Sequence, residues 1–324
     1  DLLETLREPT GPAQTQSLHL LPDGPVATRR NSRIRKARDL RSDRLYAVKT
    51  CIDPGTGLPA PNAATRQFDA LRRVSDAMGS GRFSVPEPIE LRESSAELVT
   101  AWIDGDSMTQ ALTRHPLSLG RAERVSMLAG EWLAAFHGAR TLTGGPLDVQ
   151  GKLGQVEEML HETSVRDGIF CEAVDFLRAS AMDAARAFLP RSWIHGDFKL
   201  DNLLVAPDGI VGIDVNASFE NVVVHDLASF LNHLSLLLLH PRFLRLRLAR
   251  QRLLEAFCGG YGLDSGYEVA FALRWSMLFQ LLQVWAEAEI RPGPFVKRIG
   301  LRVGMRHCCR NLVHDARKIM AGLR

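Results

Sequence analysis

The chain has 324 residues, of which 45% are hydrophobic and 24% charged, with a net charge of +3. These values are ordinary for a globular protein and exclude disordered and fibrous classes, and the length favours two lobes or domains. No stretch approaches the roughly 20 apolar residues of a membrane-spanning helix. The start lacks the basic and apolar parts of a secretion signal, and an odd number of cysteines argues against a disulfide framework, so we expect a cytoplasmic protein.

The first hundred residues have the pattern of short strands with one helix. Runs of β-branched, aromatic or alternating apolar residues predict strands at residues 17–21, 32–37, 44–52, 88–91 and 97–103. Residues 54–61 are rich in Gly and Pro and predict a loop. A helix is expected over residues 62–78, where Asn62 is a suitable first residue.

After residue 103 the pattern becomes mainly helical. Residues 121–139 form a long amphipathic segment, residues 155–188 predict one or two further helices, and helices resume at Asp226. A β-rich interlude covers residues 193–215. We therefore predict an α+β, bilobal fold, with a β-rich N-terminal lobe over 1–100, a hinge over 101–106 and a larger, mainly helical lobe over 107–324.

The β-rich interlude contains side chains suited to phosphoryl transfer. Residues 195–202 are His-Gly-Asp-Phe-Lys-Leu-Asp-Asn. Transfer from ATP demands positioning and charge neutralisation rather than covalent chemistry by the protein. Asp197 could accept a hydroxyl proton, and Asn202 could offer an amide oxygen to Mg²⁺, which prefers hard oxygen ligands. A turn and a short strand then bring the chain back, so that Asp214 is expected beside Asp197. Asp214 is the main candidate magnesium ligand. The alternative is that Asp197 and Asn202 only organise a turn.

The chain resembles the aminoglycoside phosphotransferase and choline kinase group, which has a protein-kinase-like fold. The resemblance rests on His195-Gly-Asp197, Asn202, Ile213-Asp214 and Asp226-Leu-Ala228, with a weaker motif at Tyr46-Ala-Val-Lys49. Four linked elements in order are more specific than any one of them. The resemblance implies an ATP-dependent kinase that uses Mg²⁺ and phosphorylates a hydroxyl group of a small molecule.

The resemblance also implies catalytic and metal-binding roles. Asp197 would be the catalytic base, and Lys199 would face the phosphoryl group in transfer as a second catalytic residue. Asn202 and Asp214 would hold Mg²⁺.

Further implied roles concern the nucleotide and the support of the site. Lys49 would contact the α- and β-phosphates, and the backbone of Ala101 and Ile103 would bind adenine. His195 and Asp226 would support the catalytic segment, with Asp226 bracing its backbone.

One position departs from the family pattern. The family pairs the strand lysine with a glutamate on the first-lobe helix, and Gln67 occupies that place here. Helical geometry puts Gln67 on the inward face and Asp69 about 200° away, on the solvent face. This inward face comprises Gln67, Leu71, Val74 and Met78. Gln67 could hydrogen-bond Lys49, although a carboxylate would hold the lysine more strongly.

Two further departures bear on activity. Residues 21–32, where the phosphate-covering loop is expected, contain only Gly24, and Asn216 stands where relatives often have an acid. Gln67 and Asn216 keep open a nucleotide-binding regulator without turnover, a pseudokinase. The intact set of Asp197, Asn202 and Asp214 argues against that alternative.

The charge distribution bears on the acceptor. From Leu227 onward there are 15 Lys and Arg against 6 Asp and Glu, so this third carries +9 and the rest −6. A sugar, phosphorylated or glycan-like acceptor is therefore ranked above an aminoglycoside or choline-type amine. An arginine- and leucine-rich stretch over 242–253 raises a third hypothesis, peripheral contact with an anionic surface such as a membrane. The alternative is a solvated basic face, and no nucleic-acid partner is expected.

Overall fold

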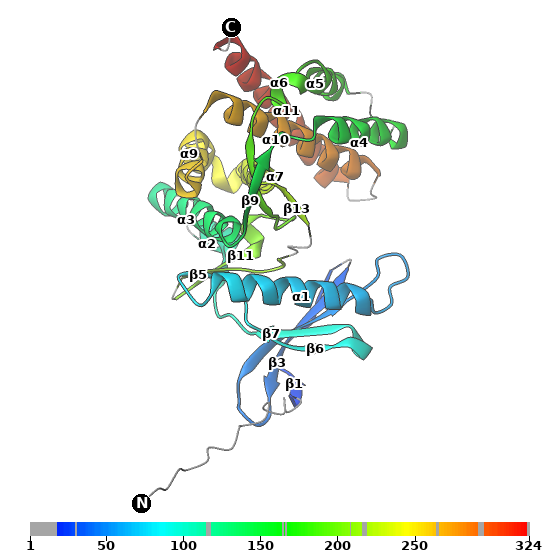
Figure 1. The fold of residues 1–324 in the computed structure, drawn as a ribbon, viewed down its shortest axis with the longest axis vertical. Helices are drawn as coiled ribbons and strands as arrows, with labels where there is room; N and C mark the ends of the chain where they lie inside the picture. The colour runs from blue at the N-terminus through cyan, green and yellow to red at the C-terminus, as the bar shows by residue number, and fades with distance from the viewer. Residues whose placement is uncertain are drawn as a thin grey trace, which may run out of the picture. The chain divides into compact units, whose positions relative to one another are not determined.

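The computed structural model describes residues 18–322 apart from 30, 115–117, 164, 166, 208, 216–218, 264–265 and 291–294. The chain divides into two compact units (Figure 1). Asp1–Ala64 with Ile89–Trp102 form the first, and Thr65–Pro88 with Ile103–Arg324 form the second. Asn216 lies outside the described residues.

A six-stranded sheet builds the first unit. Its order is β1-β3-β4-β7-β6, and β2 pairs with β3. The strands are β1 Leu20–Pro22, β2 Ala27–Arg29, β3 Ser32–Asp39, β4 Leu45–Cys51, β6 Pro88–Arg92 and β7 Glu97–Ala101. Alternate residues of β4 face opposite sides, so Tyr46 and Val48 are buried in a small core with Ala37 and Val99. The five predicted strands are present, but Ser17 is outside the described residues, β1 begins only at Leu20, and β7 ends two residues early.

Helix α1 covers Pro61–Met78 and begins one residue before its predicted start, with Pro in the first turn, where its missing N–H costs nothing. The helix turns Leu71 and Val74 into the core. The Asp69 side chain is 49% exposed and forms an ion pair with Arg72 at 3.5 Å. The prediction that Asp69 faces solvent is therefore confirmed.

Helices dominate the second unit. They are α2 Met108–Arg114, α3 Leu119–Gly138, α4 Val149–Glu162, α5 Gly168–Ala179, α6 Ala181–Ala184, α7 Val224–Leu237, α8 Leu244–Leu248, α9 Arg250–Tyr261, α10 Tyr267–Ile290 and α11 Phe295–Gly322. Asp148 and Asp167 start α4 and α5 by accepting hydrogen bonds from backbone N–H groups of the first turn. The helical stretch predicted over 155–188 is thus three helices and starts earlier, at Val149.

Two small sheets interrupt the helices. One has the order β13-β10-β9, with β9 Thr141–Gly145, β10 Leu189–Trp193 and β13 Glu220–Val222. The other has the order β5-β12-β11-β8, with β5 Phe83–Ser84, β8 Asp106–Ser107, β11 Leu203–Ala206 and β12 Gly209–Gly212. The short strands β2, β5, β8, β9 and β13 were not predicted, because a few residues carry no periodic signal. Strand β10 precedes the predicted β-rich interlude except at Trp193.

Helix α10 is 24 residues long and largely apolar. It is long and apolar enough to cross a bilayer, with a mean hydropathy of 1.2 over its most apolar window, which the sequence prediction did not anticipate. However, 67% of that window is buried inside the protein. Trp275, Phe279 and Trp285 of α10 are among the large buried side chains of the core. Burial by protein accounts for the hydropathy of α10.

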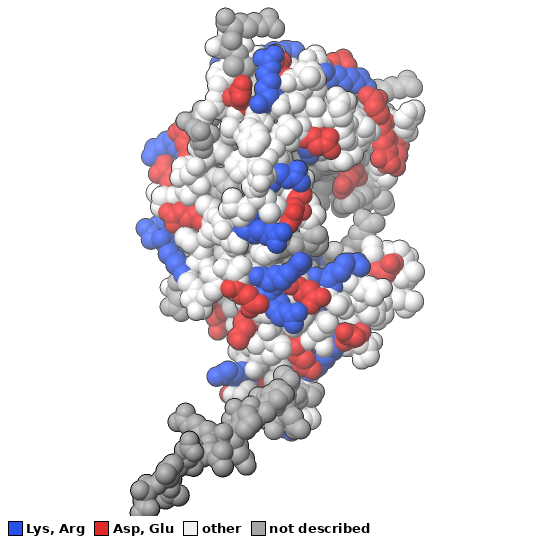
Figure 2. Space-filling view, in the orientation of Figure 1, with Lys and Arg blue, Asp and Glu red and all other residues white. Residues whose placement is uncertain are grey.

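Among the described residues, four arginines of the basic C-terminal third form ion pairs with acidic residues of the second unit, three of which lie before Leu227. These pairs are Arg252–Glu123, Arg302–Glu289, Arg306–Asp167 and Arg317–Glu172. On the face drawn in Figure 2, basic side chains are interspersed with acidic ones. The charge split along the sequence is therefore partly neutralised in three dimensions.

Candidate functional site

The hairpin of β11 and β12 brings the two predicted metal ligands to one end. Leu203 lies opposite Gly212 in the antiparallel register. Beyond that pair the Ile213 N–H donates to the Asn202 carbonyl at 2.9 Å. Asn202 ends a 3₁₀ turn over Leu200–Asn202, and Asp214 follows Ile213 directly. The hairpin thus places the Asn202 and Asp214 backbones beside each other.

Asp197, Lys199 and Asn202 meet at the start of this hairpin. The Lys199 Nζ donates to Asp197 Oδ2 at 2.5 Å. The Asn202 Nδ2 donates to the Asp197 carbonyl at 2.8 Å and to Oδ2 at 3.2 Å. The Asp197 side chain remains 59% exposed, whereas Asn202 is fully buried. The predicted base is therefore held from two sides and still open to a substrate.

The second side-chain atom of Asn202 is an unused acceptor. Its Oδ1 is buried and has no hydrogen-bond partner. Because a buried polar atom without a partner costs free energy, such atoms are uncommon in folded proteins. The Nδ2 group donates to two Asp197 oxygens, which assigns the amide orientation. Oδ1 is therefore a hard oxygen donor that fits a divalent cation.

Asp214 has an uncommon backbone conformation. Its φ is 58°, in the left-handed region, which Asp adopts more readily than most other residues. The Asp214 carboxylate and the Asn202 amide oxygen suit a hard cation whose other ligands come from phosphates and water. In the described ranges, no group of three or more His, Cys, Asp or Glu side chains is arranged to hold a metal ion.

His195 is buried and connects the segment around Asp197 to the strand that precedes Asp214. Its Nε2 lies 3.1 Å from the Ile213 carbonyl, and its ring makes edge contacts with Trp132, Phe136 and Phe198. Burial lowers the pKa of the His195 imidazole, so the ring is neutral at pH 7. A neutral imidazole with Nε2–H can donate to Ile213 and accept at Nδ1. His195 thereby ties the segment preceding the base to the residue preceding Asp214.

Asp226 on α7 holds the same segment by its backbone. Its Oδ2 accepts from the His195 N–H at 2.7 Å, and its Oδ1 accepts from the Gly196 N–H at 3.0 Å. Burial alone would raise the pKa of the Asp226 carboxyl, but the contacts with His137 and His225 outweigh it and lower the pKa. The carboxylate is ionised and makes charge-assisted hydrogen bonds to both amides.

Gly212 was missed by the sequence analysis. A Cβ on Gly212 would lie 2.0 Å from Cζ2 of Trp132. The Trp132 ring is fully buried, stacks on Phe136 and Phe198, and donates from Nε1 to the Ser84 carbonyl at 2.9 Å. Only glycine lets β12 pass so close to the ring. A glycine inside an apolar strand is a sequence signal for such an approach.

The residues predicted to bind the nucleotide are spread over both units. Lys49 is half-buried on β4, opposite Ile34 and Leu98, and Ala101 ends β7. Gln67 and Ile103 belong to the second unit and are half-buried there. Their roles stay predictions.

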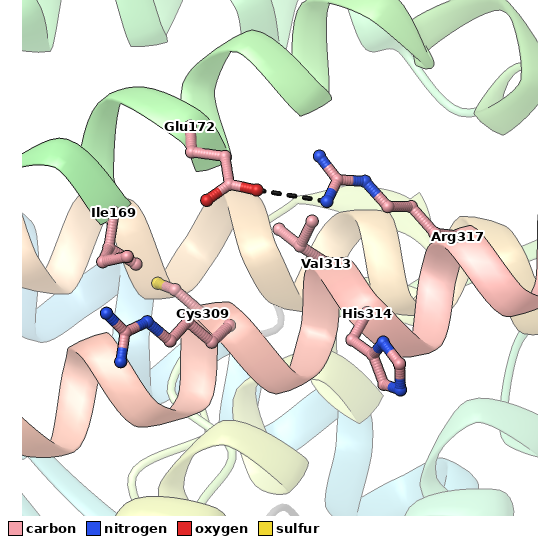
Figure 3. A pocket seen from close by; sticks show the side chains of 7 residues that line it. Ile169, Glu172, Cys309, Val313, His314 and Arg317 are labelled. Atoms are coloured by element: carbon pink, nitrogen blue, oxygen red, sulfur yellow. Dashed lines mark ion pairs between the residues drawn. The ribbon is translucent and has the colours of Figure 1, made fainter.

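Two cavities lie between α5 and α11. One of about 80 Å³ is lined by Ile169, Cys309, Val313 and charged neighbours (Figure 3). A larger one of about 630 Å³ is lined by Cys171, Phe176 and Met320, among others. The ion pair of Glu172 and Arg317, with Arg317 Nη1 3.1 Å from Glu172 Oε1, borders both. No predicted site residue lines either cavity.

The sequence matches the model of the phosphotransferase enzyme family over residues 33–273. A choline/ethanolamine kinase family protein from Mesorhizobium loti is similar in structure, with 14% identity, a TM-score of 0.56, and coverage of 95% of this chain and 90% of that one. Amicoumacin kinase in complex with AMP-PNP, Ca²⁺ and Ami has 10% identity, a TM-score of 0.59 and coverage of 89% and 88%. No curated protein matches the sequence.

A putative fructosamine-3-kinase from Thermobifida fusca is also similar, with 16% identity, a TM-score of 0.52 and coverage of 93% of this chain and 98% of that one. At these identities the likeness concerns the fold. It confirms the predicted α+β, protein-kinase-like fold, and the family match confirms the predicted resemblance.

Proposed function

The chain belongs to the phosphotransferase enzyme family and is a kinase, and on that premise we propose that it transfers the γ-phosphoryl group of ATP to a hydroxyl of a small molecule. The observation that carries this proposal is the meeting of Asp197, Lys199 and Asn202 around one exposed carboxylate. A turn-organising role alone would not need Asp197 to stay open to solvent. It would also not leave Asn202 Oδ1 buried without a partner.

In the proposed reaction Asp197 is the base. One of its carboxylate oxygens accepts the proton of the acceptor hydroxyl as the hydroxyl oxygen forms a bond to the γ-phosphorus. The bond from the γ-phosphorus to the bridging oxygen breaks, and ADP leaves with the electron pair. Lys199 keeps the carboxylate in place and adds positive charge where the phosphoryl group passes.

Asn202 and Asp214 would hold the metal ion, for which Mg²⁺ is proposed. The bound ion would neutralise charge on the phosphate oxygens. Asn202 would offer Oδ1, its unused acceptor, and Asp214 its carboxylate. Lys49 would bind the α- and β-phosphates with Gln67 as its partner, and the backbone of Ala101 and Ile103 would bind adenine, as the family resemblance implies.

For the acceptor we propose a sugar, phosphorylated or glycan-like molecule. The support is the excess of basic residues after Leu227, some of which have no ion pair in the described chain. Similar structures include a choline/ethanolamine kinase family protein and a putative fructosamine-3-kinase, so hydroxylated amines are the competing class. A panel of acceptors from both classes separates them.

The test is magnesium-dependent ATP turnover with that panel, comparing wild type with Asp197→Asn. We expect transfer to at least one acceptor and a loss of about 100-fold or more in kcat for the variant, because a positioned base contributes at least that much. Nucleotide binding without transfer to any acceptor would instead indicate a regulator. A variant as active as wild type would show that Asp197 is not the base.

We also propose that this kinase is cytoplasmic and that it docks on anionic membranes through α8. Leu244 and Leu248 of α8 are 61% and 86% exposed. Exposed Arg242, Arg245 and Arg247 flank them and form no ion pair in the described part of the chain. Apolar side chains between unpaired cations complement an anionic lipid surface, where the leucines enter the interface and the arginines meet phosphates.

Vesicle flotation with phosphatidylserine in phosphatidylcholine tests this docking. We expect wild type to float with anionic vesicles at low salt, and Leu244→Ser combined with Leu248→Ser to bind about tenfold less. Leu58→Ser is the matched control, because Leu58 is also an exposed leucine, at 64%. Equal flotation of all three proteins, or none at low salt, would exclude the proposed contact.

A further inference from the structure

We infer that Tyr261 is a positioning residue for the catalytic segment, acting through His137 and Asp226. The inference deepens the proposed function, since it rests on Asp197 being the base. Tyr261 is the last residue of α9 and lies 64 residues after Asp197 in the sequence.

Two glycines bring α9 against α3. A Cβ on Gly130 of α3 would lie 2.2 Å from the Phe257 carbonyl oxygen and 2.7 Å from the Tyr261 nitrogen. A Cβ on Gly260 of α9 would lie 2.2 Å from the Met127 carbonyl oxygen. Backbone packs on backbone here, which no larger residue at either glycine allows. As a result the last residue of α9 reaches the last turn of α3, where His137 lies.

The Tyr261 hydroxyl contacts Nδ1 of the His137 imidazole. Its Oη lies 2.9 Å from His137 Nδ1, and the two rings pack edge to face with centroids 5.6 Å apart. His137 Nε2 lies 3.1 Å from Asp226 Oδ2. The imidazole is therefore held at both nitrogens, between a tyrosine and a carboxylate.

The chemistry of the partners fixes the direction of these bonds. Asp226 is ionised, so it accepts, and the proton of His137 lies on Nε2. When the ring carries this one proton, Nδ1 is an acceptor and the Tyr261 O–H donates to it. Burial raises the pKa of the Tyr261 phenol, so the hydroxyl keeps its proton. Tyr261 thus selects the tautomer and the ring orientation that serve Asp226.

The chain of bonds ends at the base. Asp226 Oδ2 accepts from both His137 and the His195 N–H, and Oδ1 accepts from the Gly196 N–H, the residue before Asp197. His225 Nδ1 lies 3.6 Å from Oδ1, longer than a good hydrogen bond. His137 therefore makes the closest side-chain contact that orients the Asp226 carboxylate in the described residues.

The test compares Tyr261→Phe with Tyr267→Phe. The first removes the donor to His137. The second removes a buried hydroxyl that has no hydrogen-bond partner in the described structure, so it is a matched control. We expect kcat to fall about three- to tenfold in Tyr261→Phe, the effect of losing one supporting hydrogen bond. The KM for ATP should not change, because the proposed nucleotide contacts do not involve α9.

Two readouts do not depend on turnover. The ¹⁵N resonance of His137 Nδ1 should shift in Tyr261→Phe as its hydrogen bond is lost, and the amide hydrogens of His195 and Gly196 should exchange faster. Neither change is expected in Tyr267→Phe. In a His137→Gln background, adding Tyr261→Phe should have no further effect on exchange, because the link through the imidazole is already broken.

Unchanged kcat and unchanged exchange in Tyr261→Phe would overturn the inference, as would equal effects in Tyr267→Phe. If wild type transfers no phosphoryl group, the proposed function fails. The ¹⁵N and exchange measurements would still decide whether Tyr261 orients the segment through His137.

Discussion

Replacing Gly212 with alanine places a methyl group against the ring of Trp132. The added Cβ would lie 2.0, 2.5 and 2.6 Å from three ring carbons. Carbon atoms in good contact are about 3.5 to 4.0 Å apart, so the strand or the ring must move by more than 1 Å, on the order of 1.5 Å for the closest atom. The ring has little freedom, because it is fully buried, stacked on two phenylalanines and hydrogen-bonded to the Ser84 carbonyl.

The strand must therefore move, at a cost that can be bounded. Overpacking a well-filled core costs about 1 to 3 kcal/mol, and the depth of this overlap argues for the upper end, about 3 kcal/mol. A Gly→Ala change also lowers the conformational entropy of the unfolded chain, which stabilises the folded protein by about 0.4 to 1 kcal/mol. We expect a net loss of about 2 to 2.6 kcal/mol in the free energy of unfolding. Because Asp214 follows two residues later, kcat should fall as well.

Urea unfolding followed by tryptophan fluorescence measures this loss. Gly154→Ala is the matched control, since Gly154 lies inside α4 and a Cβ there meets nothing within 4 Å. That change should raise helix stability by about 0.5 to 1 kcal/mol. In a Trp132→Leu background Gly212→Ala should cost less than in wild type. A Gly212→Ala protein with the wild-type midpoint and activity would refute the predicted clash.

Three further outcomes are expected. Asn202→Ala should raise the Mg²⁺ concentration for half-maximal turnover about tenfold or more, as measured by magnesium titration, because it removes the orphaned oxygen. Lys49→Met should raise the KM for ATP about tenfold in steady-state kinetics, since a charge-assisted phosphate contact is lost. The lowered pKa of His195 means that the unfolded state binds more protons below pH 6.5, the ordinary value. The contribution of neutral His195 to the free energy of unfolding should be fully present above pH 6.5 and should decline as the pH falls below that value. Thermal unfolding measured from pH 7.5 to 5 should show a smaller loss of stability in His195→Gln than in wild type.

Local patterns in the sequence were enough for several elements. The strand at Leu45–Cys51 follows from its β-branched and aromatic residues, and the helix at Pro61–Met78 follows from a suitable first residue, Asn62, and a helical period. Both signals depend on near neighbours. The outward direction of Asp69 followed from helical period alone. The short strands and the start of α4 did not follow, because they are defined by partners far away in the chain.

The site shows the same division. The sequence by itself supplied the candidate groups for the proposed chemistry, since Asp197, Lys199 and Asn202 fall in one short segment. Only the tertiary structure decided how that segment is held. The Gly212 approach to Trp132 and the link from Tyr261 to Asp226 join residues distant in sequence, and such contacts depend on how helices and strands pack. Packing also neutralises part of the positive charge of the C-terminal third, because arginines of α9 and α11 form ion pairs with acidic residues of α3 and of the start of α5.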